Sequence, residues 1–440
     1  MSTTASTLLS LSIALLSGLL LSRLAKKIQL PAVTAYLVAG VLIGPFLLGA
    51  LGVPGIGISH EQVEGFGIIA DVALGFIAFS MGNEFRLAQL KEIGRQATVI
   101  GIFQAIGIFQ AIFTTLIVDV GLIGLHLLMP DKLSLSAAIV LGAVATATAP
   151  AATLMVVRQY KAKGPLTDIL LPVVALDDAV GLVVFAVSFG VAKSLSLDVI
   201  NPLAIVLEPL LEVVLSLALG LVMGGLFTLC ERVFHSRSKR MAVSVTFVLM
   251  TVAISSLSFT VGGIHVAFSS LLSCMMLGTV FCNFCDVSEE LMDRADRWTA
   301  PILILFFVIS GAELELSVFN QLAVVLIGMA YIATRSIGKY FGARISAQMT
   351  KCNPNIIKYL GITLLPQAGV ALGMAIKATA LGADGSIVRN ITLFAVLIYE
   401  IVGPFLTKIA LTKAGDIKAE GKTSAREEAK LAIEAAKKQA

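Results

Sequence analysis

Two adjacent aspartates, Asp177 and Asp178, lie near the centre of the apolar run LLPVVALDDAVGLVVFAV at residues 170–187. A run of this length is typical of a membrane-spanning helix. A carboxylate at the depth of a bilayer costs about 2.5–3.5 kcal/mol on insertion scales, so an adjacent pair there indicates a function. Two carboxylates in a low dielectric do not easily ionise together, and a monovalent cation then competes with protons for their oxygens. The pair therefore predicts an ion or proton site within a membrane.

The composition is that of a polytopic helical membrane protein. Of 440 residues, 57% are hydrophobic and only 14% are charged, and the mean hydropathy is +0.95. Soluble domains carry about 25% charged residues. Because the apolar runs are continuous, helices are expected and not the alternating strands of a barrel. The sequence predicts an all-α membrane protein with about 13 transmembrane helices of about 20 residues, at 7–23, 31–49, 66–82, 97–119, 134–157, 166–192, 203–229, 241–259, 264–281, 299–312, 320–346, 356–380 and 388–410.

The loops that follow odd-numbered spans are rich in arginine and lysine, whereas the other loops hold few. Positive charge marks cytoplasmic loops, so we expect the N-terminus outside and the C-terminus in the cytoplasm, in an inner or plasma membrane. Residues 411–440 are polar, and a capping box at Ser424 and Glu427 predicts a short cytoplasmic helix or a partly disordered tail.

Two predicted spans contain a proline that interrupts the helix. Pro150 lies in ATATAPAAT (145–153) of the fifth span, and Pro366 lies in LLPQAG (364–369) of the twelfth. A proline in a helix removes a backbone hydrogen bond and leaves carbonyls without partners. These two spans are seven helices apart and so cross the membrane in opposite directions. This pattern predicts an inverted repeat of spans 4–6 and 11–13, with two broken helices crossing at the binding site.

The same symmetry relates other intramembrane charges to the aspartates. It maps the sixth span onto the thirteenth, where Glu400 is a second buried acid, and the fourth onto the eleventh, which contains Arg335 and Lys339. Arg335 either caps carbonyls of a broken helix or pairs with the aspartates. We favour the pair, because an acid and a base inside a membrane each cost less together. Lys339 is a further candidate charge partner, although we expect its side chain to extend to the cytoplasmic interface.

Neutral oxygens near the aspartates suit a hard cation such as Na⁺. Thr146, Thr148, Thr153 and carbonyls freed at the break are candidate ligands. Helix packing by small polar residues is the alternative explanation for Thr146 and Thr153.

Eight segments together carry a family pattern that covers nearly the whole membrane part. They are LPAVTAYLVAGVLIGP (30–45), FIAFSMGNEF (76–85), TATAPAATLMVVRQYKAKGPL (146–166), VVALDDAVG (173–181), PILILFFVISGAELEL (301–316), RSIGKYFGAR (335–344), LLPQAGVALG (364–373) and YEIVGP (399–404).

With these segments the chain resembles the monovalent cation:proton antiporter superfamily (sodium/proton exchanger fold), in its paired-aspartate branch. The resemblance implies that Asp178 is the essential cation- and proton-binding carboxylate, a ligand of Na⁺, and that Asp177 is the second aspartate. Thr148 matches the threonine of the broken helix. Arg335 matches the basic partner, where paired-aspartate relatives usually carry lysine. Arginine does not readily deprotonate, so this departure leaves the proton stoichiometry open.

The resemblance also implies a homodimer with an elevator-like motion. The expected parts are 1–96 (scaffold and dimerisation helices 1–3), 97–192 (core helices 4–6), 193–240 (linker helix 7), 241–319 (scaffold helices 8–10), 320–410 (core helices 11–13) and 411–440 (a short cytoplasmic tail).

The predicted function is exchange of Na⁺ (or Li⁺) for H⁺ by alternating access, with K⁺/H⁺ exchange as the nearest alternative. A Na⁺-coupled solute symporter is a more distant alternative, because the core offers few polar groups beyond the aspartates, the threonines and Gln367. The expected partners are these ions and membrane lipid. We expect no enzymatic activity, no cofactor and no nucleic acid.

Overall fold

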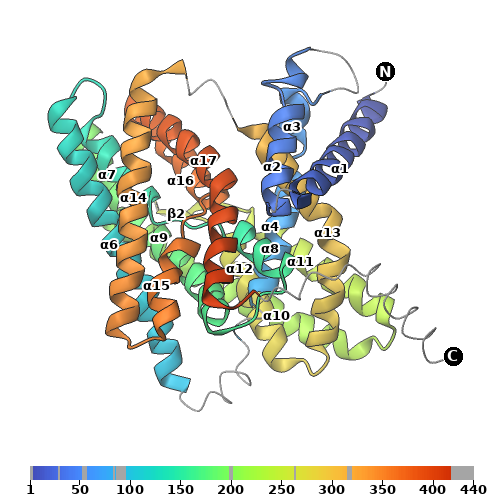
Figure 1. The fold of residues 1–440 in the computed structure, drawn as a ribbon. Coiled ribbons are helices and arrows are strands. Elements are labelled where there is room, and N and C mark those ends of the chain that lie inside the picture. Colours follow the sequence, from blue (N-terminus) through green and yellow to red (C-terminus); the bar gives the residue numbers. More distant parts are fainter. Residues whose placement is uncertain are drawn as a thin grey trace.

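The computed structural model describes residues 3–27, 30–51, 57–82, 85, 96–197, 202–261, 264–314 and 320–417. The chain in these ranges is almost entirely helical (Figure 1), as the sequence predicts. The predicted tail helix beyond Ser424 lies outside the described residues. The helices are α1 (Thr3–Lys27), α2 (Ala32–Ile43), α3 (His60–Gly65), α4 (Gly67–Gly82), α6 (Gln96–Leu128), α7 (Leu135–Val144), α8 (Pro150–Gln159), α9 (Pro165–Leu197), α10 (Pro202–Val233), α11 (Arg237–Ser255), α12 (Ser270–Phe284), α13 (Ser288–Glu313), α14 (Leu322–Met349), α15 (Pro354–Thr363), α16 (Gly369–Ala378) and α17 (Ala383–Ala414), with the short 3-10 turns η1 (Leu48–Leu51) and η4 (Thr379–Leu381).

Among the described residues, ten helical segments are long and apolar enough to cross a bilayer. Three predicted spans have no such segment. They coincide with the 15-residue helix α12 and with the half-helix pairs α7/α8 and α15/α16. The total of about 13 spans stays a prediction, since it depends on how these shorter helices lie in a membrane.

Two boundaries differ from the sequence-based expectation. The tenth span is longer than the predicted 299–312. Helix α13 starts at Ser288, because the amphipathic segment SEELMDRADRW continues the helix. The eighth and ninth spans do not reach 259 and 264. The antiparallel strands β1 (Phe259–Val261) and β2 (Ile264–Val266) pair there instead, in a segment rich in the β-branched and aromatic residues that favour strands.

The helices pack as two neighbouring groups (Figure 1). In one group α6 lies along α14, α7 packs on α6 and α9, and α17 packs on α14, α15 and α16. In the other, α2 packs on α1 and α13, while α4 packs on α12 and α13. Helix α10 contacts both α9 and α12, and α2, α4 and α17 make contacts between the groups. The division into a moving core and a fixed scaffold stays a prediction.

The breaks in the two interrupted spans have matching construction. Each of α7, α8, α15 and α16 has ten residues. Pro150 is the first residue of α8, a position where the missing N–H of proline removes no helical bond. Helix α7 ends at Val144 and α15 ends at Thr363, leaving non-helical segments at 145–149 and 364–368 that each begin with a turn. The segments meet, because the Ala149 amide donates to the Pro366 carbonyl at 2.8 Å.

The end of α17 is fastened to the start of α9. Asp416 is 4% exposed, and its Oδ2 accepts hydrogen bonds from the Thr167 amide (2.7 Å) and hydroxyl (2.8 Å). The Lys163 amide donates to the Asp416 carbonyl at 2.9 Å. A carboxylate at a helix N-terminus is favourable, because the first amides of the helix lack intrahelical partners and carry partial positive charge. Asp416 therefore caps the helix that carries the paired aspartates.

Candidate cation site at the crossing of two broken helices

Asp177 is fully buried and is bonded by three side chains, two from helices and one from the first break. Lys339 of α14 approaches it with Nζ–Oδ2 at 2.5 Å, and both side chains are 0% exposed. Thr148, in the break between α7 and α8, donates its hydroxyl to the same Oδ2 at 2.5 Å. Gln110 of α6 donates its side-chain amide to Oδ1. Asp177 is therefore a neutralised carboxylate with both oxygens occupied.

Lys339 links this carboxylate to the break. Its Nζ donates to the Thr146 carbonyl at 2.5 Å and to the Thr148 hydroxyl at 3.0 Å. An ammonium has three protons to donate, and these two acceptors together with Asp177 use all of them. The sequence-based prediction that Lys339 extends to the cytoplasmic interface is wrong, because the cost of its burial is offset by this full set of acceptors.

Arg335 has a different role from the predicted one. Its Nε donates to the Ala145 carbonyl at 2.9 Å, Nη2 to Ala147 at 2.7 Å and Nη1 to Leu365 at 2.7 Å. Its guanidinium also lies over the ring of Tyr399, with Cζ 4.5 Å from the ring centroid. Arg335 thus holds carbonyls from both breaks and joins them.

The predicted pairing of Arg335 with the aspartates is therefore wrong, and Lys339 occupies the position of the basic partner. Both residues lie on one face of α14, since they are four positions apart. The sequence alone could not decide which of the two lies at the depth of Asp177 and which lies at the depth of the carbonyls in the two breaks. The departure from the paired-aspartate pattern disappears, because the partner is a lysine.

Asp178 is 6% exposed, and its environment is unlike that of Asp177. Its Oδ1 has no hydrogen-bond partner among the described residues. The backbone amide of Thr148 faces its carboxylate, and the charges of Asp177 and Lys339 act on it. A carboxylate buried with an unused oxygen needs a proton or a cation, so Asp178 has the free coordination capacity that Asp177 lacks.

The remaining predicted site residues lie around the crossing. Thr146 donates its hydroxyl to the Ala143 carbonyl at 2.7 Å, whereas the buried Thr153 hydroxyl has no partner in the described part of the chain. Gln367 donates to the Val144 carbonyl at 3.0 Å and to the Tyr331 hydroxyl at 2.9 Å. Glu400 is buried on α17, away from the contacts of Asp177.

Sequence reasoning missed Gln110 as a partner of Asp177. The available signal was an uncharged but strongly polar amide within the apolar segment GIFQAIGIFQAIF of the fourth predicted span. Such a group inside a membrane needs a hydrogen-bond partner. Gln110 reaches Asp177 because α6 and α14 approach closely: a Cβ on Gly338 or Gly342 would lie 2.8 Å from the Thr114 Cα or 3.1 Å from the Gln110 Cα.

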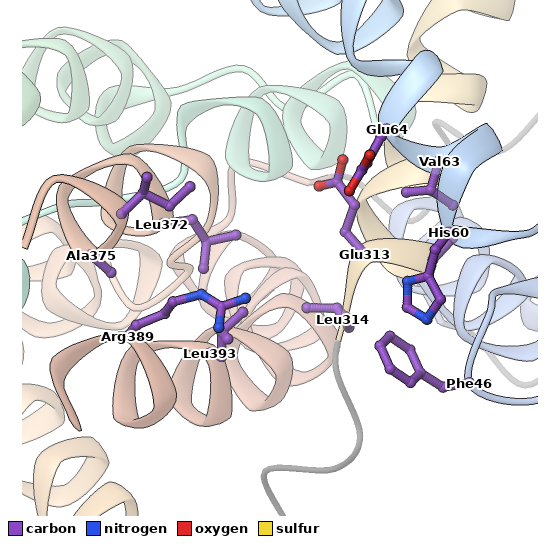
Figure 2. A pocket seen from close by; sticks show the side chains of 12 residues that line it. Phe46, His60, Val63, Glu64, Glu313, Leu314, Leu372, Ala375, Arg389 and Leu393 are labelled. Atoms are coloured by element: carbon purple, nitrogen blue, oxygen red, sulfur yellow. The ribbon is translucent and has the colours of Figure 1, made fainter. Parts of the chain in front are cut away.

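Two cavities lie at opposite ends of α13. One, of about 540 Å³, is lined by residues of α3, α16 and α17 and by Glu313 at the end of α13 (Figure 2). The other, of about 850 Å³, is lined by residues of α8 and by Met292 to Ile304 of α13. The 540 Å³ cavity thus lies against α16, a half-helix of the break at 364–368. The 850 Å³ cavity lies against α8, a half-helix of the break at 145–149.

Comparison with known proteins shows which proteins share this sequence pattern and fold. The family model described as sodium/hydrogen exchanger, transmembrane, matches residues 11–413. The high-affinity Na⁺/H⁺ antiporter NhaS3 of Synechocystis sp. is 22% identical over 91% of this chain and 88% of its own length. The Na⁺/H⁺ antiporter NhaS4 of the same organism is also 22% identical, over 91% and 95%.

Among solved structures, the sodium proton antiporter MjNhaP1 of Methanocaldococcus jannaschii at pH 8 has the same fold. The TM-score is 0.62 at 19% identity, over 92% of this chain and 95% of that chain. The family match extends over nearly the entire described chain and includes both broken helices and the aspartate pair. The chain belongs to the sodium/hydrogen exchanger family.

Proposed function

We propose that this protein exchanges Na⁺ (or Li⁺) for H⁺ by alternating access, with Asp178 as the residue that binds the cation. The observation that carries the proposal is Asp178 itself, buried with an unused oxygen beside a neutralised Asp177–Lys339 pair. The names of the relatives from Synechocystis support the choice of Na⁺ and H⁺.

The exchange follows from competition at one carboxylate. A proton on Asp178 satisfies the buried group, and an arriving Na⁺ displaces this proton, because one carboxylate cannot keep both in a low dielectric. The proton leaves to water in the open cavity. The Thr153 hydroxyl and the carbonyls at the break offer neutral oxygens, which Na⁺ prefers.

Lys339 offers a second proton in this proposal. Na⁺ near the aspartates weakens the attraction of Asp177 for the ammonium, and Lys339 can then give up a proton, which arginine does not readily do. Lysine at this position therefore supports an exchange of more than one proton per cation, which moves net charge. This is the consequence of finding Lys339 and not Arg335 at Asp177.

The two cavities support alternating access. Each lies between α13 and a half-helix, α8 or α16, from one of the two breaks. Movement of the helices that carry the breaks relative to α13 would widen one cavity and narrow the other. In this proposal α6–α9 and α14–α17 form the moving core, α1–α4 and α11–α13 form the scaffold of a homodimer, and the basic loops face the cytoplasm.

K⁺/H⁺ exchange is the second candidate, since the same oxygens bind either ion. Solute symport is less favoured, because the described core offers few polar groups around the crossing beyond the aspartates, the threonines and Gln367.

The deciding experiment is proton flux in proteoliposomes against Na⁺, Li⁺ and K⁺, under an imposed membrane potential. We expect flux with Na⁺ and Li⁺ that depends on the potential, and no flux in Asp178→Asn. Asp177→Asn should reduce the rate and the voltage dependence. Wild-type exchange in Asp178→Asn would disprove the site, and flux with K⁺ alone would favour the second candidate.

Competition also predicts a pH dependence. The Na⁺ concentration for half-maximal exchange should rise as the pH falls, because protons then occupy Asp178 more fully. The maximal rate at saturating Na⁺ should change less. A half-saturating Na⁺ concentration that does not change with pH would contradict binding of both ions to one carboxylate.

A further inference from the structure

A second group of carboxylates lies at the 540 Å³ cavity, apart from the paired aspartates. Glu64 of α3 and Glu313 of α13 both line this cavity, and Figure 2 shows their carboxylates turned toward each other. Arg389 of α17 lines the facing wall. Two acids thus face one strong base around a space large enough for water.

Glu400 lies deeper on the same face of α17. The cavity-lining residues Arg389 and Leu393 precede it by eleven and seven positions, which are helical spacings for a common face. Its side chain is 5% exposed, and its Oε2 has no hydrogen-bond partner among the described residues. Glu313 is the charged group that acts on it electrostatically. Glu400 is thus a buried acid on the face of α17 that lines the cavity, within electrostatic reach of Glu313.

Glu400 also lies close to the second break. Gly403, three positions further along α17, packs on Pro366, since a Cβ there would lie 2.9 Å from the Pro366 Cα. Along α17, Glu400 therefore lies between the cavity-lining residues Arg389 and Leu393 and the contact of Gly403 with the second break.

A buried carboxylate with one oxygen that lacks a hydrogen-bond partner is not stable as a bare anion. It keeps a proton or takes up a cation. An ammonium is bound to Asp177, but no basic group is bonded to Oε2 of Glu400 in the described chain. The nearby carboxylate of Glu313 increases the negative potential, which favours a small cation over a neutral ligand. Carboxylate oxygens are hard ligands that suit Na⁺.

We propose that Glu400 and Glu313 form a secondary binding site for a monovalent cation on the route from this cavity to the crossing. Na⁺ from the cavity displaces the proton of Glu400, and that proton passes to cavity water. The site raises the local Na⁺ concentration on one face of the membrane only. This inference rests on the proposed function, since it gives a transported cation a place to bind before it reaches Asp178.

The test measures Na⁺ dependence of exchange from each face, in right-side-out and everted vesicles. Glu400→Gln keeps the shape of the side chain and removes its charge. We expect the half-saturating Na⁺ concentration to rise about tenfold on the face that bears Glu64, the effect of losing one charged ligand, and to stay unchanged on the other face. Glu313→Gln, with its exposed side chain, should shift it in the same direction.

Glu61→Gln is the matched control. Glu61 lies on α3 beside Glu64, is exposed, and is absent from the cavity lining, so its loss should leave both half-saturation values unchanged. Unchanged values on both faces for Glu400→Gln and Glu313→Gln would overturn the proposal. Equal shifts on both faces would do the same, because they would indicate a general change in the protein.

A binding measurement separates this proposal from the proposed function. In purified Asp178→Asn, broadening of the ²³Na resonance should persist weakly, and the addition of Glu400→Gln should abolish it. Persistent broadening in that double variant would overturn the secondary site. Absence of Na⁺-coupled proton flux in the wild type would refute the proposed function without deciding the result of this measurement.

Discussion

At the scale of single residues, Asp177 and Lys339 form a buried ion pair that costs free energy to desolvate and holds both side chains in one position. Both side chains are withdrawn from solvent, with their charged atoms 2.5 Å apart. Burying one ion without its partner leaves an uncompensated charge in a low dielectric, whereas removal of both charges can be nearly neutral. The pair therefore makes each member depend on the other.

The first prediction concerns this dependence. Lys339→Gln should destabilise the protein by about 3–5 kcal/mol, because it leaves Asp177 charged and buried. Asp177→Asn in the same chain should recover most of that loss. Thermal unfolding in detergent measures both variants, and a double variant no more stable than Lys339→Gln would contradict the pairing.

Substitution of Arg335 by lysine keeps the positive charge and changes only the hydrogen-bonding geometry. The ammonium of Arg335→Lys can remake only some of the three hydrogen bonds that the planar guanidinium donates to backbone carbonyls. We expect a loss of about 1.5–3 kcal/mol for each bond not remade, with part of the exchange activity retained. Arg344→Lys on the same helix is the control, since Arg344 is exposed. Equal melting temperatures for both variants would show that the carbonyl bonds do not hold the breaks together.

At the scale of elements, the approach of α6 to α14 decides whether Gln110 reaches Asp177. Gly338 and Gly342 lie where any larger side chain would meet the backbone of α6. Small residues allow such close contact between membrane helices.

Gly338→Val should separate α6 from α14 and reduce exchange at least as much as Gln110→Ala. Gly124→Val, at a position of α6 with open space around it, should leave exchange unchanged. Proton flux at saturating Na⁺ checks both, and normal flux in Gly338→Val would show that the close approach is not needed.

Several elements could be predicted from the sequence because strong local signals specify them. Long apolar runs gave the spans, the prolines at 150 and 366 gave the breaks, and the cost of buried charge gave Asp177 and Asp178. The exchange of roles between Arg335 and Lys339 could not be predicted. It depends on the depth at which α14 lies against the breaks, which tertiary packing sets. The start of α13 and the hairpin after α11 also lacked a distinct apolar signal.

At the scale of the whole molecule, one ion pair bridges the two helix groups. Arg158 of α8 and Asp296 of α13 approach to 2.7 Å at the larger cavity. Ser80 of α4 donates to the same carboxylate oxygen at 3.0 Å. A motion that carries α8 away from α13 would break this pair.

The prediction here is kinetic. Arg158→Gln or Asp296→Asn should change the maximal exchange rate by up to about fivefold, since a partly exposed pair contributes at most about 1 kcal/mol. The pH dependence of half-saturation should be preserved, because Asp178 is untouched. The charge-swapped double variant Arg158→Asp with Asp296→Arg should restore the wild-type rate, and failure to restore it would show that the pair is not a bridge between moving parts.

The cap that Asp416 places on α9 has a mechanical consequence. Because Asp416 follows the last turn of α17 and is bonded to the first turn of α9, a pull on the chain beyond Asp416 acts on α9 before it can unwind α17. The helix loaded in this way is the one that carries Asp177 and Asp178. Force applied at the C-terminus, by a bead or a tethered surface, would therefore act on the helix that carries the ion site. Single-molecule tension could then perturb exchange without a substitution in the site.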